Sequence, residues 1–444
     1  MVKRVCFLFL LFLFACNAGK RHESEISINV PANANLLVML RNQLQQFEQR
    51  HQINVKLIPF TGQEKLYAMM AANQEPDVFY TNTVVRDQLA AEGRLLDLFT
   101  FVEGDSFIKK IRPEFIERGT SLDGGWYQFC DWTYTLGVYY NKSLFDLHRV
   151  PYPDSNWNWK GMLRRAEELT LDIDGDNKID QYGIYIAEHF VSAIERMNGA
   201  TYAPNTLLFS LNEASKEALQ LYVDLMYEHR VMPEMALAQA QGMQLSQMLN
   251  ANKVAMIVEA LPNLDFITSL QVDWDVAPLP QIGTEPPRYF RSMSGGLSIS
   301  SGCRYPQKAW ELIKWLVLES PYNSPNPVLK NINFVESWQE KYPGLKNTHF
   351  GQVWRLSEKY DGGDIRDFVR YSSWSSATIL ETLAPQMDKL FANKISIEQI
   401  EKIEDDINKR VIDELKIMMS NENLRPAFRE KIRNALNKIS AIGS

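Results

Sequence analysis

The sequence lacks the short motifs by which many hydrolases, metalloenzymes and nucleotide-binding enzymes are recognised. Its 444 residues contain no HExxH, CxxC or GxSxG pattern and no phosphate-binding P-loop. No two histidines stand at metal-ligand spacing among His22, His51, His148, His189, His229 and His349. The carboxylates of a glycosidase can lie far apart in a chain, so the 54 acidic residues say little about that class. We therefore expect a protein that is not an enzyme.

Cysteine is scarce, with four residues in the whole chain, two of them close to the N-terminus. The other two, Cys130 and Cys303, lie far apart in the sequence, and an oxidising compartment would permit a disulfide between them. Their positions in the sequence carry no geometric information about such a bridge. We expect two buried free thiols, with the disulfide as the alternative.

Positive charge is in the minority, since 47 Lys and Arg stand against 54 Asp and Glu, for a formal net charge of −7. No basic patch with interleaved aromatic residues is present, which argues against nucleic acid as a partner. Aromatic residues, in contrast, make up 11% of the chain. Those beyond the needs of the core can form a binding surface.

Long apolar runs are confined to the N-terminus. Two basic residues precede an uninterrupted apolar run over residues 5–15, which is short for a membrane span but typical of a secretory signal. The run ends in LFAC, and a small residue followed by cysteine resembles the bacterial lipobox. We predict a signal peptide over residues 1–15, lipidation at Cys16 and a polar tether over residues 16–23. An ordinary signal peptide cut nearby is the alternative. Because no later run is long enough to span a bilayer, we expect an anchored rather than an integral membrane protein.

The chain after the tether alternates between strand-like and helix-like segments. Apolar or alternating runs predict strands, and apolar residues at helical spacing predict helices. The predicted strands cover residues 24–30, 54–60 and 75–83, and the helices between them cover residues 36–51 and 63–74. This β-α-β-α-β order is the signature of a mainly parallel sheet with helices on both faces.

Small polar residues follow two of these strands, at residues 31–35 and 81–83. Ligands of such sheets bind beyond the carboxyl ends of the strands, so both segments are expected at one rim. Asn82 and Thr83 are therefore candidate ligand contacts. Capping of the next helix, over residues 84–93, is a compatible alternative role.

The pattern changes in the aromatic segment of residues 126–141. It leads to a helix for which Asn158 is a plausible N-cap, and Trp157 and Trp159 flank this cap as a structural staple. A strand is predicted over residues 253–260, and the C-terminal part is mostly helical.

Four blocks carry a resemblance to a known family. They are LGVYYNKSLFDLHRVPYPDSNWNWKGMLRRAEELT (136–170), DIDGDNKIDQYGI (172–184), NANKVAMIVEA (250–260) and MSGGLSISSGCRYPQKAWELIKWL (293–316). In this order, behind a lipobox, they resemble the bacterial extracellular solute-binding protein family 1, which includes maltose-binding protein and many sugar-binding lipoproteins of ABC importers. The resemblance implies an α/β, two-lobed periplasmic-binding-protein-like fold (type II), with mixed sheets flanked by helices, a hinge and an interlobe cleft.

The resemblance also implies how the chain is divided. It places the crossings between lobes near residues 136–140, 289–293 and 327–332. The first lobe would hold residues 24–136 and 293–328, the second lobe residues 137–290 and 333–420, and a helical tail residues 421–444. Gly137 and the Gly295–Gly296 pair lie inside strand-like segments near two crossings. Glycine in a strand often marks a bend or the close approach of another group, so a hinge or a ligand contact is expected there, with a simple bulge as the alternative.

Residue chemistry and the resemblance together single out candidate ligand contacts. Aromatic faces suit the C–H surfaces of sugars, and polar side chains suit their hydroxyls, because a buried unpaired donor costs roughly 1–3 kcal/mol. The candidates are Asn82, Thr83, Asp131, Trp132, Tyr134, Glu259, Ser294, Gly295, Gly296 and Trp374. Core packing or lobe–lobe contact is the alternative for the aromatic and acidic members.

Two of these candidates depend on the family pattern. Trp374 stands where the family often places a ligand-stacking tryptophan. Near Glu259 the family commonly has Gly and then Trp, whereas this chain has Ala260 and Pro262. Contacts of the maltose type therefore do not transfer directly, and Glu259 is expected to face the cleft with its own ligand preference.

An acidic loop is a candidate cation site. Against the EF-hand pattern, positions 1, 3, 5, 7 and 9 are Asp172, Asp174, Asp176, Lys178 and Asp180. Position 12 is Gly183 instead of glutamate, so the bidentate ligand is missing. A structural calcium ion and a solvated acidic turn both stay open, and no cofactor is required. We expect this loop on the outer surface, away from the cleft.

The leading hypothesis is a monomeric, lipid-anchored extracytoplasmic receptor. It would capture a mono- or oligosaccharide by lobe closure and deliver it to the permease of an ABC importer. A sensor subunit docking on a membrane signalling protein, a receptor for a non-sugar solute and a secreted carbohydrate-active enzyme are the alternatives.

Overall fold

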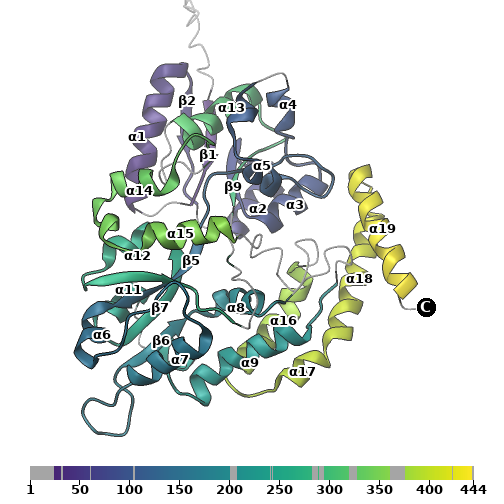
Figure 1. The fold of residues 1–444 in the computed structure, drawn as a ribbon. Helices are drawn as coiled ribbons and strands as arrows, with labels where there is room; N and C mark the ends of the chain where they lie inside the picture. The colour runs from purple at the N-terminus through teal and green to yellow at the C-terminus, as the bar shows by residue number, and fades with distance from the viewer. Residues whose placement is uncertain are drawn as a thin grey trace, which may run out of the picture.

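A computed structural model describes residues 25–31, 34–60, 62–103, 106–200, 208–240, 242, 244–282, 289, 295–319, 328–360, 376–422 and 424–442. These residues form two α/β lobes, one above the other in Figure 1. Each lobe is built on its own mixed β-sheet with helices packed against it. The expected fold class, with two mixed sheets flanked by helices, is confirmed.

The first sheet has the strand order β2-β1-β3-β9-β4. Its strands are β1 (Glu25–Asn29), β2 (Asn54–Leu57), β3 (Val78–Thr81), β4 (Phe129–Cys130) and β9 (Gly296–Ile299). Strand β1 is parallel to β2 and β3, with helices α1 (Ala34–His51) and α2 (Gln63–Ala71) between them in the chain. The predicted β-α-β-α-β series is therefore confirmed. Strand β9 is antiparallel to both β3 and β4, so a segment from much later in the chain completes the sheet.

The second sheet has the order β6-β7-β5-β8. Its strands are β5 (Thr135–Asn141), β6 (Tyr182–Ile186), β7 (Val254–Leu261) and β8 (Trp274–Pro278). All residues of β5 and β7 are buried, as expected for central strands covered on both faces. The sequence pattern does not predict β8, because its apolar residues run into a proline-rich segment. Pro278 ends an edge strand, where a missing N–H is tolerated.

Helix α7 (Trp159–Glu168) begins as the sequence predicts. The side-chain oxygen of Asn158 accepts a hydrogen bond from the Gly161 N–H at 2.8 Å. The buried Trp157 indole donates to the Pro278 carbonyl at 2.8 Å, which ties the helix start to β8. Trp159 is half-buried against the same hydrophobic core. The capping role of Asn158 and the structural roles of both tryptophans are confirmed.

The chain passes between the two lobes more than once. It passes from β4 to β5 through residues 131–134 and returns between β8 and β9. It leaves the first lobe again near Leu329, which pairs with Ile111. The next helices, α14 (Phe334–Lys341) and α15 (Phe350–Lys359), pack with the second-lobe core. Residues 137–140 already pair with both β7 and β8, and Leu136 pairs with β7, so the first passage precedes them. The lobe boundaries stay predictions.

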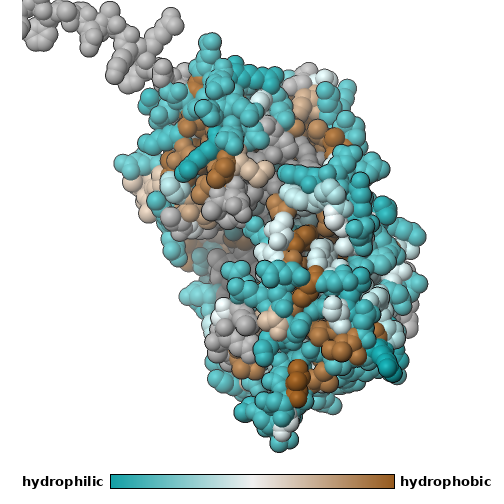
Figure 2. Space-filling view, turned by 90° about the vertical axis from the view of Figure 1, so that its left-hand side faces the viewer, coloured by the Kyte–Doolittle hydropathy of each residue, from teal (hydrophilic) through white to brown (hydrophobic). Residues whose placement is uncertain are grey.

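Helices make up the described chain after residue 376. They are α16 (Ser376–Phe391), α17 (Ile397–Glu401), α18 (Glu404–Ser420) and α19 (Pro426–Ile442). In Figure 1 α18 and α19 lie along one side of the molecule, and α14 lies on the other. The face in Figure 2 is largely hydrophilic, with apolar residues in small patches. No helix within the described ranges has the length and apolarity to cross a membrane.

Cys130 and Cys303 are free thiols, as expected, but burial is confirmed for Cys130 only. Cys130 is buried in the first-lobe core, whereas Cys303 is only partly buried at its margin. Burial raises the pKa of Cys303 to about 12, so this thiol is a weak nucleophile at neutral pH.

Candidate functional site

The register of the first sheet brings several predicted ligand contacts to one edge. Gly296 pairs with Thr81 at the end of β3 and with Cys130 at the end of β4. Continued by one residue, this antiparallel register sets Asn82, Gly295 and Asp131 side by side beyond the sheet. We call Asn82, Thr83, Asp131 and Gly295 the polar rim. Its members come from three distant parts of the chain.

Close packing surrounds the two glycines at this edge. A Cβ atom on Gly296 would lie 2.1 Å from the Phe129 carbonyl oxygen, and one on Gly295 would lie 2.5 Å from the Tyr80 hydroxyl. Gly296 therefore requires glycine because backbone atoms approach closely, whereas a side chain at Gly295 would require the Tyr80 ring to move. Neither residue has the positive φ that would mark a turn. Packing against Phe129 accounts for Gly296, and the predicted hinge or ligand contact at these glycines stays a prediction.

A buried polar network supports the rim from below. The Thr81 hydroxyl lies 2.8 Å from the Ser298 hydroxyl and accepts a hydrogen bond from the Gln128 side chain at 2.8 Å. All three residues are almost fully buried. Gln128 was not among the predicted contacts, and a lone amide side chain in an aromatic strand-like segment is the only signal of it in the sequence.

Asn82 has a confirmed structural role. Its side-chain oxygen accepts a hydrogen bond from the Val85 N–H at 2.9 Å and caps α3 (Thr83–Ala91). Its amide nitrogen makes no hydrogen bond to the described residues. The buried Thr83 hydroxyl also has no hydrogen-bond partner among them. Such a group costs about 1–3 kcal/mol if it stays unpaired, so a ligand hydroxyl at this point would be stabilising. Contact with a ligand stays a prediction for both residues.

The segment between the lobes presents an aromatic face. Asp131, Thr133 and Thr135 are buried, while Trp132 and Tyr134 alternate with them and are half-exposed. The two rings stack with centroids 4.8 Å apart and planes 28° from parallel. The Thr133 hydroxyl, like that of Thr83, lacks a hydrogen-bond partner within the described chain. The sequence analysis did not select Thr133, because only burial distinguishes it from other threonines.

The second lobe contributes Glu259 from β7. It pairs across the sheet with Gly137 of β5, close to the point where β5 leaves the interlobe segment. Glu259 is only 8% exposed, and its Oε1 accepts hydrogen bonds from the Ala260 N–H at 2.7 Å and from Asn263 at 3.3 Å. Burial raises the pKa of Glu259, and these two hydrogen bonds oppose the rise. Its predicted ligand contact is not tested by this placement.

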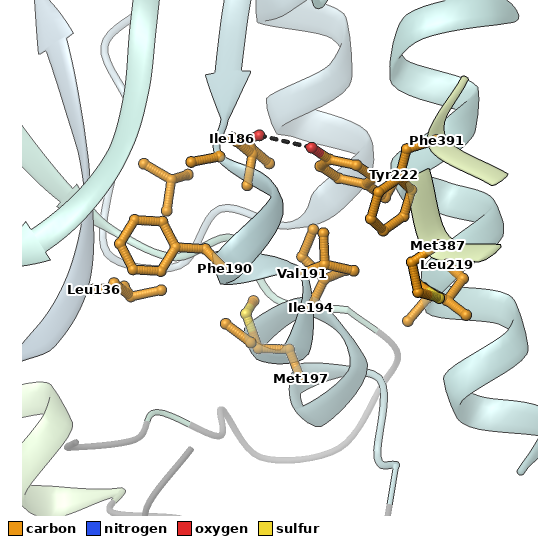
Figure 3. Close-up of a cluster of buried hydrophobic side chains, with 14 of the residues drawn as sticks. Leu136, Ile186, Phe190, Val191, Ile194, Met197, Leu219, Tyr222, Met387 and Phe391 are labelled. Atoms are coloured by element: carbon orange, nitrogen blue, oxygen red, sulfur yellow. Dashed lines mark hydrogen bonds between the residues drawn. The ribbon is translucent and has the colours of Figure 1, made fainter. Parts of the chain in front are cut away.

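An apolar cluster holds the start of β5 and its surroundings in place. Figure 3 shows Leu136 beside Phe190, with Ile194 and Met197 of α8 (Val191–Met197) on the same side. The Tyr222 hydroxyl of α9 (Glu213–Tyr227) donates to the Ile186 carbonyl at 2.9 Å. These side chains are buried and form a rigid support for the second-lobe wall.

Three predicted residues lie outside the described residues. They are Ser294, Trp374 and the lipidation candidate Cys16. A separate cavity of about 610 Å³ lies between Arg112 of the first lobe and helices α14 and α15. It is lined by Lys330 and Arg355 among others and contains none of the predicted ligand contacts.

The acidic loop is exposed and precedes β6 in the second lobe. One carboxylate oxygen from each of Asp172, Asp174 and Asp176 lies within 4.8 Å of the other two. The same carboxylates already accept backbone hydrogen bonds, for example Asp172 from Gly175 at 2.7 Å and from Asn177 at 2.8 Å.

Neighbouring groups also hold the rest of this loop. The Lys178 ammonium lies 2.7 Å from Asp176 and lowers the pKa of that carboxyl. Asp180 accepts a hydrogen bond from the Ile173 N–H at 2.8 Å. The donor set suits calcium, but the loop is also a complete turn without it. The choice between ion and turn stays open.

Two α/β lobes between which the chain passes more than once, with polar and aromatic side chains gathered near residues 131–134, define a two-lobed binding protein. The chain belongs to the bacterial extracellular solute-binding protein family, whose sequence model matches residues 34–320. The family resemblance carried by the four sequence blocks is thereby confirmed, and the family is an extracellular one.

Solved structures share this fold at low identity. An ABC substrate-binding protein from Listeria monocytogenes, in complex with cycloalternan, has a TM-score of 0.72 and 19% identity over 87% of this chain and 98% of that one. The maltose/maltodextrin-binding domain MalE from Bdellovibrio bacteriovorus, bound to maltotriose, has a TM-score of 0.68 and 18% identity, over 88% of this chain and 100% of that one. An ABC transporter solute-binding protein from Thermotoga lettingae, bound with α-D-tagatose, has a TM-score of 0.67 and 17% identity, over 87% of this chain and 100% of that one. No curated protein matched the sequence. These likenesses confirm the two-lobed fold.

Proposed function

We propose that the protein captures a carbohydrate between its lobes and delivers it to the permease of an ABC importer. Membership of the solute-binding family and the sugars held by the three similar structures support this proposal. The observation that carries it is the polar rim next to the stacked Trp132–Tyr134 pair. Hydroxyl-binding groups beside an aromatic face match the two kinds of surface on a sugar ring.

Each residue then has a distinct role. Trp132 packs against the C–H face of a sugar ring, with Tyr134 stacked behind it. Asp131 and the Asn82 amide bind hydroxyls from the first lobe, and the Thr83 and Thr133 hydroxyls gain the partners they lack among the described residues. From the second lobe, Glu259 completes the set on closure. The roles of Ser294 and Trp374 rest on the family resemblance alone.

A thermal-shift screen tests the ligand class. Mono- and oligosaccharides are compared with amino acids, short peptides and polyamines. A ligand at a hundredfold excess over its Kd stabilises the folded state by about 2.7 kcal/mol, which gives a measurable rise in melting temperature. A response to sugars alone supports the proposal. If only another class of solute raises the melting temperature, that class is the ligand instead. If no sugar raises it, the carbohydrate assignment is contradicted.

The same closure could serve sensing, so the partner needs its own experiment. Ligand-loaded protein is incubated with membranes of its own cells, and the captured complex is identified. Recovery of permease subunits supports transport, whereas a signalling kinase would assign the sensor role. We also propose that the protein leaves its ligand unchanged. Incubation followed by chromatography of the sugar would reveal any product and so contradict this.

The proposed location is the outer side of a membrane, with residues 1–15 removed and a lipid on Cys16. The extracellular family and the LFAC sequence support this. Cys16→Ala should move the protein from the membrane fraction to the released fraction. If this variant stays in the membrane fraction, the proposed lipid anchor at Cys16 is contradicted. The proposed monomer is checked by light scattering on the released protein.

A further inference from the structure

The last two long helices form a hairpin that touches both lobes. Helix α18 rises beside the second lobe, and α19 returns beside the first (Figure 1). We call α18 and α19 the C-terminal hairpin. In sequence it is separate from the passages by which the chain goes from one sheet to the other.

The α18 end is fixed to the second lobe. Asn408 exchanges two hydrogen bonds with the backbone of Phe209, at 2.8 and 3.0 Å. Glu404 accepts a hydrogen bond from the Leu211 N–H at 3.2 Å. The apolar face of α18 packs on α16, and Phe391 of α16 contacts Tyr222 of α9. This half of the hairpin is therefore part of the second lobe.

Arg425, just before the first turn of α19, makes polar contacts with the first lobe. The Arg425 N–H donates to the Ala91 carbonyl at 3.3 Å, and its guanidinium donates to the Leu95 carbonyl at 3.2 Å and to the Tyr127 hydroxyl. The guanidinium also lies 5.2 Å from the centre of the Tyr127 ring and 3.9 Å from Asp123. Leu95 bridges to the residue after β9, so these partners belong to the first lobe.

These groups form one directed network. The Tyr127 hydroxyl donates to Asp123 at 2.6 Å while it accepts from Arg425. Burial, followed by the hydrogen bond to Asp123, raises the pKa of Tyr127, so the hydroxyl keeps the proton that this arrangement needs. The Asp123 side chain is 8% exposed, and loss of Arg425 would leave a buried carboxylate without its cation.

We propose that the C-terminal hairpin is a further connection between the lobes and that Arg425 is a positioning residue that restricts their relative movement. One end of the hairpin is attached to the first lobe and the other end to the second. If the lobes rotated freely relative to each other, at least one of these attachments would be strained. The hairpin therefore narrows the range of lobe orientations in the ligand-free protein. This holds for any solute and does not depend on the carbohydrate proposal.

The test measures lobe separation directly. Spin labels are placed through unnatural amino acids at the exposed positions Gln49 on α1 and Lys160 on α7, and the distance distribution is recorded by pulsed electron resonance without ligand. Arg425→Ala should broaden and shift this distribution. Arg425→Lys keeps the charge but not the two-sided fork, and should give an intermediate width.

Arg429→Ala is the matched control. Arg429 lies on the same helix, but its guanidinium donates to the Met419, Asn421 and Leu424 carbonyls inside the hairpin. The distance distribution of Arg429→Ala should match that of the unmodified protein. Equal broadening in both alanine variants, or none in Arg425→Ala, would overturn the proposal. If Arg425→Ala does not fold, Asp123→Asn tests the same network, with a broadened distribution expected and an unchanged one contradicting it.

Discussion

The polar rim and the acidic loop both concentrate polar side chains, but they are organised in opposite ways. In the loop, Asp172 bonds to backbone groups three and five residues further along the chain. In the rim, Asn82, Asp131 and Gly295 meet only because β9 lies between β3 and β4. A dense acidic motif is thus a local feature that needs little else, whereas a dispersed set of ordinary residues makes the candidate site.

The largest expected effect comes from adding a methyl group at the rim. In Gly296→Ala the new Cβ would meet the Phe129 carbonyl oxygen at 2.1 Å, and β4 and β3 hold the strand from both sides. We expect the free energy of unfolding to fall by about 3 kcal/mol, measured by chemical denaturation. In the loop, Gly175→Ala meets no atom within 4 Å but has a φ of +80°, and should cost only about 1 kcal/mol.

Gly344→Ala controls for both changes, because no atom lies within 4 Å and no positive φ is involved. It should alter stability by less than about 0.5 kcal/mol. If Gly296→Ala were no worse than this control, the tight strand register assigned to the rim would be incorrect.

The next effect separates binding from stability at the aromatic face. Trp132→Ala should weaken binding of the sugar found in the screen by about tenfold, since an aromatic contact contributes roughly 1.5 kcal/mol. Calorimetry measures this loss. Trp159→Ala, a half-buried tryptophan on α7, should lower the melting temperature but leave the affinity of the folded protein unchanged. Equal affinities in the unmodified protein and Trp132→Ala would remove Trp132 from the site.

A smaller effect distinguishes the two roles of Asn82. Asn82→Ala removes the helix cap and should lower the free energy of unfolding by about 1 kcal/mol. Asn82→Ser keeps a capping oxygen but removes the amide, so it should retain stability and lose ligand affinity. Melting curves and calorimetry on both variants give the answer. Full affinity in Asn82→Ser would leave Asn82 with capping alone.

The smallest effect is expected in the acidic loop. Its aspartates already accept backbone hydrogen bonds on an exposed surface, so the melting temperature in calcium should equal that in a chelator. Asp172→Asn should behave like Asp154→Asn, which alters an exposed turn where Asp154 accepts from the Asn156 N–H. A calcium-dependent rise that disappears only in Asp172→Asn would establish the metal clip instead.

Local signals predicted several features correctly. The apolar spacing of the first series predicted its strands and helices, and Asn158 and Asn82 cap helices as their positions suggest. These features depend on hydrogen bonds and burial within a few residues, which a sequence pattern records. Strand β8 was not predicted, because prolines at its end make the segment look like a loop. Its strand conformation depends on pairing with β5, which comes from a distant part of the chain.

The candidate site was only partly predictable for the same reason. Trp132 and Asp131 were selected from residue type and family position, but nothing in the sequence distinguished Thr133 or Gln128. Their importance depends on burial and on partners from other strands. The attachment of Arg425 to Tyr127 was likewise invisible, because it joins the end of the chain to the first lobe.

By itself the sequence determined the α/β class, the family, the early helix caps and the position of the acidic loop. Each is encoded by neighbouring residues or by the order of blocks along the chain. The tertiary structure alone decided which polar groups meet at the rim, why Gly296 must be glycine, and where the C-terminal hairpin attaches. Those outcomes depend on strand register and helix packing between segments that folding, and not the local sequence, brings together.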